Sequence, residues 1–228
     1  MRSNKYHDLT IPLVTPANGV LLSKSRNEAL RQPTGLVQFA WNDQDPFLYN
    51  RMFDENLISF DENYCSVVND IQGLTTVPTL SYLPRILESH LAPNPVIIDI
   101  GCGQGEFVKA LRKSGVDAIG YDPVLRRAES FLHPEYWSPA APPADLYVMR
   151  CVLPHIPDPW NFLQLIAESS PRSLVLIEFQ RLEWIIENDM WYQIGHGHVN
   201  FLPRSTSNAD TKSSIKASSP MANGGGFS

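Results

Sequence analysis

A glycine-rich turn flanked by acidic residues is the strongest chemical feature of this 228-residue sequence. The segment DIGCGQG occupies residues 99–105 after a short apolar run, and Asp122 lies 23 positions after Asp99. Glycines allow a tight turn and a close approach of the backbone to a ligand, while free amides at a helix start suit a polar or anionic group. An acid at the end of the next strand can accept hydrogen bonds from ribose hydroxyls. The pattern predicts a nucleotide-type site.

The glycine spacing separates two classes of nucleotide-binding turn. A dinucleotide fingerprint needs GxGxxG, but Glu106 stands at the third glycine position counted from Gly101 and Gly103. The spacing here is GxGxG. It disfavours a nicotinamide oxidoreductase.

His155 is the first candidate for proton transfer. It lies in LPHIPD at residues 153–158, just past a predicted strand, where such folds place their ligands. An unperturbed imidazole pKa near ~6.5 suits proton removal at neutral pH. The alternative is that His155 and Asp158 only shape the turn and cap a helix beginning near Pro159.

A second histidine cluster, GHGHVNF, occupies residues 195–201. His196 and His198 in an HxH pattern suggest a metal pair, but two ligands alone are weak evidence for one. A loop with two solvated histidines is the alternative. The cysteines, Cys65, Cys102 and Cys151, contain no CxxC pair, so no zinc site and no disulfide framework are predicted.

Alternating strand and helix patterns position these residues on an α/β fold. The sequence predicts a Rossmann-like, mostly parallel sheet with helices on both faces. Strand-type runs lie at 96–98, 118–121, 146–152 and 174–179, with helical patterns around Phe107–Leu111 and Trp160–Ile166. Three weaker predictions are a helix over 80–91 with Pro84 near its first turn, a helix opened by Pro123, and a minimal edge strand at Tyr136-Trp137.

Composition divides the chain into three regions. Residues 1–76 predict an irregular N-terminal cap with one or two short helices and a strand-like run at 36–40. Residues 77–203 predict the Rossmann-like domain. Residues 204–228, dominated by serine, glycine and asparagine, predict a disordered tail.

At these motifs the sequence resembles the class I S-adenosylmethionine-dependent methyltransferases. VIIDIGCGQG is similar to their first motif and GYDP, residues 120–123, to their second. The resemblance implies S-adenosylmethionine as cofactor, with Asp99 binding its amino group and Asp122 its ribose. The other implied cofactor-binding residues are Gly101, Cys102, Gly103 and Gly105 in the turn, and Arg150 and Cys151 after the fourth strand.

Residues 144–163 and 176–202 are similar to the sugar C-methyltransferase subgroup. That resemblance implies a catalytic His155 facing the reaction centre and a second catalytic histidine at His198, with His196 as an alternative to the latter. Gly197 stands where the subgroup has a glutamate. Glu178, Trp184, Trp191 and Tyr192 would form an acceptor wall, and Tyr49, Phe53 and Tyr64 a lid or part of the core.

Two departures from the subgroup accompany this resemblance. Residues 33–38 resemble the segment that follows a cysteine-ligated zinc module, but the cysteines are absent. The sequence also turns at Pro203 into its polar tail, so the sheet is expected to lack the C-terminal strand hairpin and to leave the fifth strand as an edge.

Composition narrows the function classes. A net charge of −6 argues against a nucleic-acid-binding protein. No run of residues approaches the ~18 apolar residues of a membrane span. No signal peptide is visible, so a cytoplasmic protein is expected. The predicted function is methyl transfer to a small-molecule acceptor, with a nucleotide sugar as one candidate. The competing hypothesis is a degenerate, non-catalytic S-adenosylmethionine-binding protein. The sequence indicates no oligomeric state.

Overall fold

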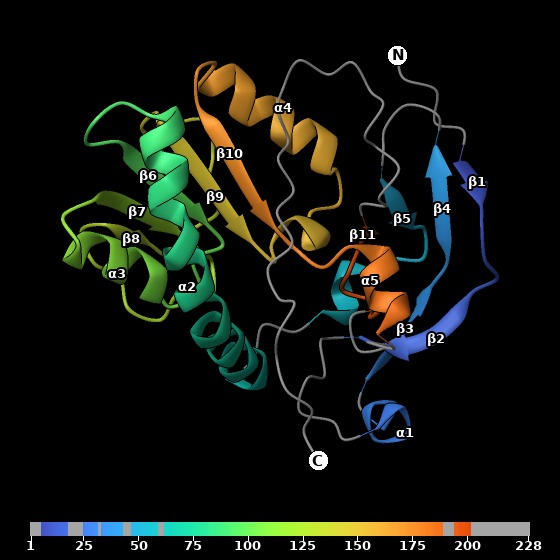
Figure 1. The fold of residues 1–228 in the computed structure, drawn as a ribbon. Coiled ribbons are helices and arrows are strands. Elements are labelled where there is room, and N and C mark those ends of the chain that lie inside the picture. Colours follow the sequence, from blue (N-terminus) through green and yellow to red (C-terminus); the bar gives the residue numbers. More distant parts are fainter. Residues whose placement is uncertain are drawn as a thin grey trace.

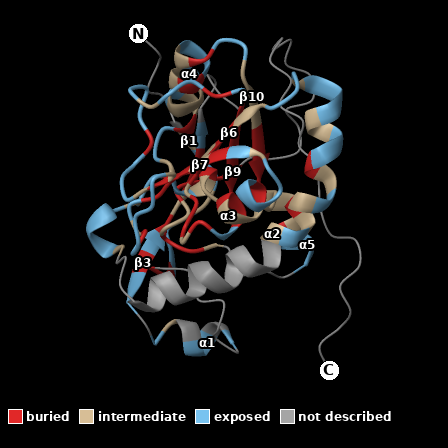
Figure 2. Cartoon of the chain, turned by 90° about the vertical axis from the view of Figure 1, so that its left-hand side faces the viewer, coloured by how far each residue is buried: buried red, intermediate tan, exposed pale blue. Residues whose placement is uncertain are grey.

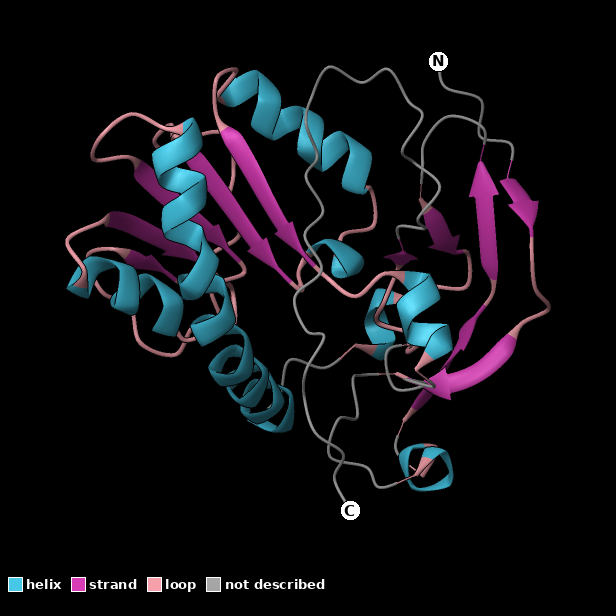
Figure 3. Ribbon diagram, viewed as in Figure 1, coloured by secondary structure: helices cyan, strands magenta, loops and turns pink. Residues whose placement is uncertain are grey.

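The strands of the computed structural model form two separate groups (Figures 1 and 3). The structure describes residues 6–17, 25–31, 33–42, 47–58, 62–188 and 194–201. One group is a parallel sheet flanked by helices, and the other consists of short strands, most of them from the N-terminal part. The predicted tail at 204–228 lies outside the described residues.

The parallel sheet has the strand order β10-β9-β6-β7-β8. Its members are β6 (Val96–Ile100), β7 (Asp117–Tyr121), β8 (Leu132–His133), β9 (Leu146–Arg150) and β10 (Leu174–Glu178). All four pairings are parallel. The strand order reverses between β6 and β9, which makes the carboxyl ends of these two strands the expected ligand-binding crevice. The predicted Rossmann-like sheet is confirmed.

Helices cover both faces of this sheet. Helices α2 (Glu62–His90) and α3 (Glu106–Lys113) pack on one face through Leu83, Phe107 and Leu111. Helix α4 (Pro159–Ser169) packs on the other face through Ile166. The strands are therefore buried from both sides, as Figure 2 shows for the centre of the molecule.

Three local predictions were wrong. Helix α2 begins at Glu62 and carries Pro84 in its interior, where contacts of Leu83 with the sheet outweigh the proline's poor fit to a helix. No helix follows Pro123, since residues 123–131 form turns. The edge strand β8 lies at Leu132–His133 rather than at Tyr136-Trp137, because the Leu132 side chain packs beside Gly105 and Gly120.

The N-terminal part, expected to be irregular, contains five short strands. β1 (Tyr6–Asp8), β4 (Phe39–Asn42) and β5 (Leu48–Asn50) join β11 (Asn200–Phe201) in one sheet, and β2 (Leu13–Pro16) pairs with β3 (Thr34–Val37). The short helices are α1 (Arg26–Ala29) and η1 (Glu55–Leu57). Strand β11 thus attaches the end of the described chain to the N-terminal strands rather than to β10.

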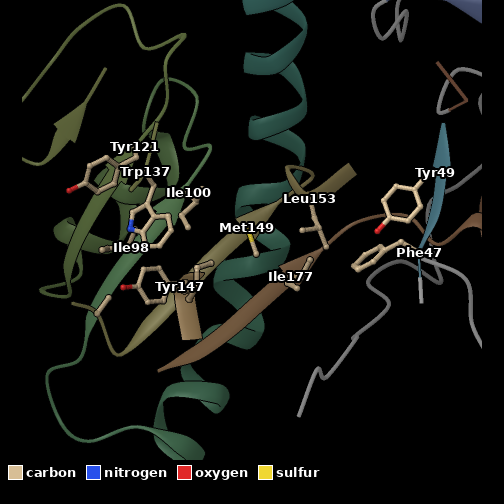
Figure 4. Packing of buried hydrophobic residues seen from close by; sticks show 12 residues of the cluster. Phe47, Tyr49, Ile98, Ile100, Tyr121, Trp137, Tyr147, Met149, Leu153 and Ile177 are labelled. Atoms are coloured by element: carbon tan, nitrogen blue, oxygen red, sulfur yellow. The ribbon is translucent and has the colours of Figure 1, made fainter. Parts of the chain in front are cut away.

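Two elements lie between these groups of strands: η2 (Leu153–His155), directly after β9, and α5 (Leu182–Glu187), after β10. Buried side chains continue across this region. Phe47, directly before β5, and Tyr49 of β5 share a hydrophobic cluster with Leu153 and Ile177, as Figure 4 shows. Within the described residues, no helix has the length and apolarity that a bilayer crossing requires.

Candidate functional site

The glycine turn after β6 is shaped by three left-handed backbone positions. Gly101, Gly103 and Gly105 have φ of 71°, 56° and 80°, in the region that side chains other than glycine rarely adopt. A Cβ at Gly101 would lie 2.3 Å from Cγ2 of Val152, so this turn packs against the segment after β9. Gly105 immediately precedes α3 and contributes no side-chain cap. The backbone N–H groups at the start of that helix therefore need acceptors from the backbone or from a ligand.

Asp122 joins the glycine turn to the end of β7. Its Oδ2 accepts a hydrogen bond from Gly103 N at 2.7 Å, and its Oδ1 accepts one from Val124 N at 2.8 Å. Burial raises the pKa of Asp122, and the two backbone hydrogen bonds oppose that rise. Each carboxylate oxygen has two acceptor positions, so each retains one for a ligand hydroxyl.

Asp99 and Arg150 form a buried ion pair at the ends of β6 and β9. Arg150 Nη2 lies 3.3 Å from Asp99 Oδ2, and its guanidinium lies over the Phe107 ring at 4.2 Å. Arg150 Nη1 also donates to Oγ1 of Thr76 on α2. Burial raises the pKa of Asp99, while Arg150 lowers it. Asp99 is 1% exposed, and its Oδ1 accepts no hydrogen bond from any residue that the structure describes.

Glu178 extends this polar row to β10. It stands opposite Arg150 in register, and Thr79 Oγ1 lies 2.9 Å from both of its carboxyl oxygens. Burial raises the pKa of Glu178 to about 7, against the lowering effect of the Thr79 hydrogen bond. The carboxyl of Glu178 therefore contacts helix α2. Trp184 packs in a hydrophobic cluster with Phe39 and Phe201, and the other two predicted wall residues, Trp191 and Tyr192, lie outside the described residues.

The two described cysteines are structural neighbours of the site. Burial raises the pKa of both thiols, so both are protonated at neutral pH. Cys102 is fully buried beneath Gly120. Cys151 has φ of 56°, and its backbone N–H donates to Glu178 O at 2.7 Å. This sharp backbone reversal ends β9 next to the candidate crevice.

His155 and His198 lie together, with ring centroids 4.7 Å apart. His155 Nδ1 is 2.8 Å from the carbonyl oxygen of Gly197. A carbonyl can only accept, so Nδ1 carries the proton and Nε2 keeps a lone pair. Desolvation lowers the pKa of His155, with the Gly197 hydrogen bond acting the other way, and this shift favours the neutral ring that can accept a proton.

The alternative for Asp158 is confirmed by its geometry. Its Oδ1 accepts from Asn161 N at 2.9 Å, and Pro159 follows at the first position of α4. Asp158 is thus an N-cap. His155 caps no helix, and it is exposed at the end of the 3-10 turn η2.

His196 does not share a site with the other two histidines. Its ring is 0% exposed, stacks on Phe53, and is 2.7 Å from Leu36 O through Nδ1. Its Nε2 accepts from Asp54 N at 2.8 Å. Both nitrogens are therefore used in holding backbone, and His196 is a structural residue.

A pocket adjoins His198 on the side of α5. Side chains of η2, of the segment after β10 and of β11 surround it, and the aromatic walls come from Phe179 and Phe201. Its lining is Leu153, Pro154, Phe179, Gln180, Ile185, His198, Asn200 and Phe201. The pocket is small, with space for about one water-sized group, so it marks only part of a candidate acceptor site.

Several of these residues escaped the sequence prediction. Thr76 and Thr79 sit in a polar stretch of α2, and Gln180 follows β10 without any motif. One signal was present: Asp99, Arg150 and Glu178 end adjacent parallel strands and share the face of the sheet covered by α2. Because side chains alternate between the two faces of a sheet, these three positions predict a row of polar side chains on one face at the carboxyl ends of the strands.

The residues at the crevice fit the ligand that the motifs imply. Asp99 Oδ1 is a buried acceptor available for a cationic amine, and Asp122 retains acceptor positions for ribose hydroxyls. The positive-φ glycines leave backbone space where side chains would intrude. These features suit S-adenosylmethionine, which carries a cationic amine for Asp99 and ribose hydroxyls for Asp122.

Comparison with known proteins gives a family match and several similar solved structures. A family model described as a methyltransferase domain matches residues 77–209, more than half of the chain. No curated protein matches. A solved structure of the mitomycin 7-O-methyltransferase is 17% identical, with a TM-score of 0.38 over 63% of this chain. The chain covers 51% of that protein's length.

Proposed function

Since this chain belongs to the methyltransferase domain family, we propose that it transfers a methyl group from S-adenosylmethionine to a small-molecule acceptor. One observation carries the proposal: two strand-end acids and the left-handed glycine turn meet at the point where the strand order reverses. S-adenosylmethionine supplies a methyl group already activated by its sulfonium. The protein's task is to align the acceptor and manage its proton.

The residues of the crevice divide that task. Gly101, Gly103 and Gly105 admit the methionine end of the ligand, and Asp99 Oδ1 accepts from its amino group. Asp122 accepts from the ribose hydroxyls while it fixes the turn through Gly103 N. The Arg150 guanidinium opposes the rise that burial causes in the pKa of Asp99 and so favours its ionised form.

His155 is the proposed general base. The carbonyl of Gly197 holds the Nδ1–H, so the Nε2 lone pair takes a proton from the acceptor. His198 lines the pocket and its ring contacts the His155 ring, which supports a joint role for the two histidines. Removal of a hydroxyl proton would lead to oxygen methylation, and removal of a proton beside a carbonyl to carbon methylation.

Only the reacting group of the acceptor is proposed to lie at the small pocket beside His198, with the rest of the acceptor outside it. A nucleotide-linked sugar is the first class to test, on the resemblance of residues 144–163 and 176–202 to sugar C-methyltransferases. The panel should pair keto-sugar nucleotides with uncharged hydroxylated rings, because the pocket walls include Phe179 and Phe201.

Formation of S-adenosylhomocysteine over this panel tests the proposal. Turnover above the acceptor-free background, lost in His155→Gln, is the expected result. Binding of S-adenosylmethionine without turnover for any acceptor would instead support a non-catalytic binding protein. Thermal stability of the variant, measured alongside, controls for unfolding.

A further inference from the structure

The base proposed above depends on a single backbone carbonyl, that of Gly197. Because His155 Nδ1 donates to it at 2.8 Å, its position selects the ring tautomer that leaves Nε2 able to accept a proton. Gly197 has no side chain with which to anchor itself. Its anchors are therefore the groups that bind its backbone and those of its neighbours.

The N-terminal strands hold this backbone in place. Gly197 N donates to Ala17 O and His196 N donates to Pro16 O, both at 2.9 Å. A Cβ at Gly197 would lie 3.2 Å from Ala17 O and 3.1 Å from Ile58 Cδ1, so the peptide fits closely between these segments.

The buried ring of His196 also fixes the loop at 196–200, through hydrogen bonds to the N-terminal part of the chain. It occupies the space beside Gly35, where an added Cβ would come within 2.3 Å of its Cγ. Its Nδ1–H donates to Leu36 O at 2.7 Å, and its Nε2 accepts from Asp54 N at 2.8 Å. One ring thereby joins β3, the segment before η1 and the peptide that precedes Gly197.

Asn50 adds a second buried link. Its Nδ2 lies 3.3 Å from both Leu36 O and His196 O, and its Oδ1 accepts from Gln38 N and Met52 N. Asn50 is 4% exposed. Its amide therefore ties the His196 backbone to the N-terminal strands at a buried position where water does not compete.

The far end of the loop is bound to the turn that carries His155. Val199 N donates to Pro154 O at 2.7 Å, and Asn200 Nδ2 donates to Leu153 O and Ile156 O at 2.8 and 2.7 Å. The loop at 196–200 thus connects the N-terminal strands directly with η2. The methyltransferase match begins at residue 77, so the anchors at Leu36, Asn50 and Asp54 lie outside it.

We propose that His196 and Asn50 are positioning residues, through which the N-terminal strands fix the Gly197 carbonyl and so set the tautomer and orientation of His155. This proposal rests on the proposed function, since it assigns the base of that reaction its orienting partner. Neither positioning residue is required to touch S-adenosylmethionine or the acceptor.

His196→Asn is the primary test, because asparagine retains a donor for Leu36 O but loses the acceptor for Asp54 N. Gly197→Ala is the second variant: its backbone tolerates alanine, and the added Cβ presses on Ile58 and Ala17. Ser170→Ala is the matched control, since it removes a buried hydrogen bond between the residue after α4 and Tyr147 of β9.

Nitrogen-15 NMR of the histidine rings reads the tautomer directly, with the His155 signals assigned by their loss in His155→Gln. The wild-type chain and Ser170→Ala should show the Nδ1–H form of His155. His196→Asn and Gly197→Ala should show a mixture with the Nε2–H form. Their kcat should fall about tenfold, less than for removal of the base itself, with KM for S-adenosylmethionine within about twofold of wild type.

An Nδ1–H form retained in both folded variants, with unchanged kcat, would overturn the proposal. So would a wild-type His155 in the Nε2–H form. The ring measurement needs no acceptor, so it decides this inference separately from the proposed methyl transfer, whose failure would appear only as absent turnover in the wild-type chain.

Discussion

Gly101→Ala tests the packing of the glycine turn against the end of β9. Alanine in the left-handed conformation costs about 1–2 kcal/mol, and Gly101 has φ of 71°. Its Cβ would lie 2.3 Å from Val152 Cγ2, and forcing an extra carbon into such a contact costs about 1–3 kcal/mol more. We therefore expect the free energy of unfolding to fall by about 2–5 kcal/mol, measured by urea denaturation.

Gly115→Ala separates the two contributions. Gly115 has φ of 83°, but a Cβ there would have no neighbour within 4 Å. Gly115→Ala should therefore lower the free energy of unfolding by the conformational cost alone, about 1–2 kcal/mol. Combining Gly101→Ala with Val152→Ala should recover part of the steric loss as a coupling energy of about 1–2 kcal/mol. Equal losses at Gly101 and Gly115, or no coupling to Val152, would refute the packing argument.

Three further changes test other parts of the site. Burial raises the pKa of Glu178 from 4.5 to about 7. Between these two pH values the folded chain holds a proton on Glu178 that the unfolded chain has released, so the free energy of unfolding falls as the pH rises from 4.5 to about 7. Glu178→Gln should match the wild-type unfolding free energy at pH 5 and exceed it by about 1–3 kcal/mol at pH 8; equal gains at both pH values would contradict this. His155→Gln should lower kcat at least about 100-fold while calorimetry finds S-adenosylmethionine binding unchanged, and undiminished turnover would exclude it as the base. Asp158→Ala should destabilise the chain by about 1 kcal/mol in urea by uncapping α4, and unaltered stability would argue against the cap.

The sequence predicted the parts of the fold whose signals are local. The apolar runs of β6, β9 and β10 are short and continuous because α2, α3 and α4 bury both faces of these strands. The glycine turn was predictable because its three left-handed positions are occupied by glycine. The N-cap Asp158 was predictable from the proline that follows it.

Long-range contacts determined what the sequence left open. His196 was ambiguous because its partners at Leu36 and Asp54 are more than 140 positions away. Strand β11 has only two residues, and its pairing with β5 carries no periodic pattern. Helix α2 was cut short in the prediction because Pro84 is unfavourable locally, while the packing that sustains the helix comes from the sheet.

Calorimetric titration with S-adenosylmethionine tests the central claim most directly. We predict saturable one-to-one binding to the wild-type chain, no comparable binding of NAD, and loss of the signal in Asp122→Ala. Asp117→Ala, at the start of the same strand and paired with Arg112 on the surface, should bind like wild type. Binding of NAD without S-adenosylmethionine, or undiminished affinity in a folded Asp122→Ala variant, would contradict the account.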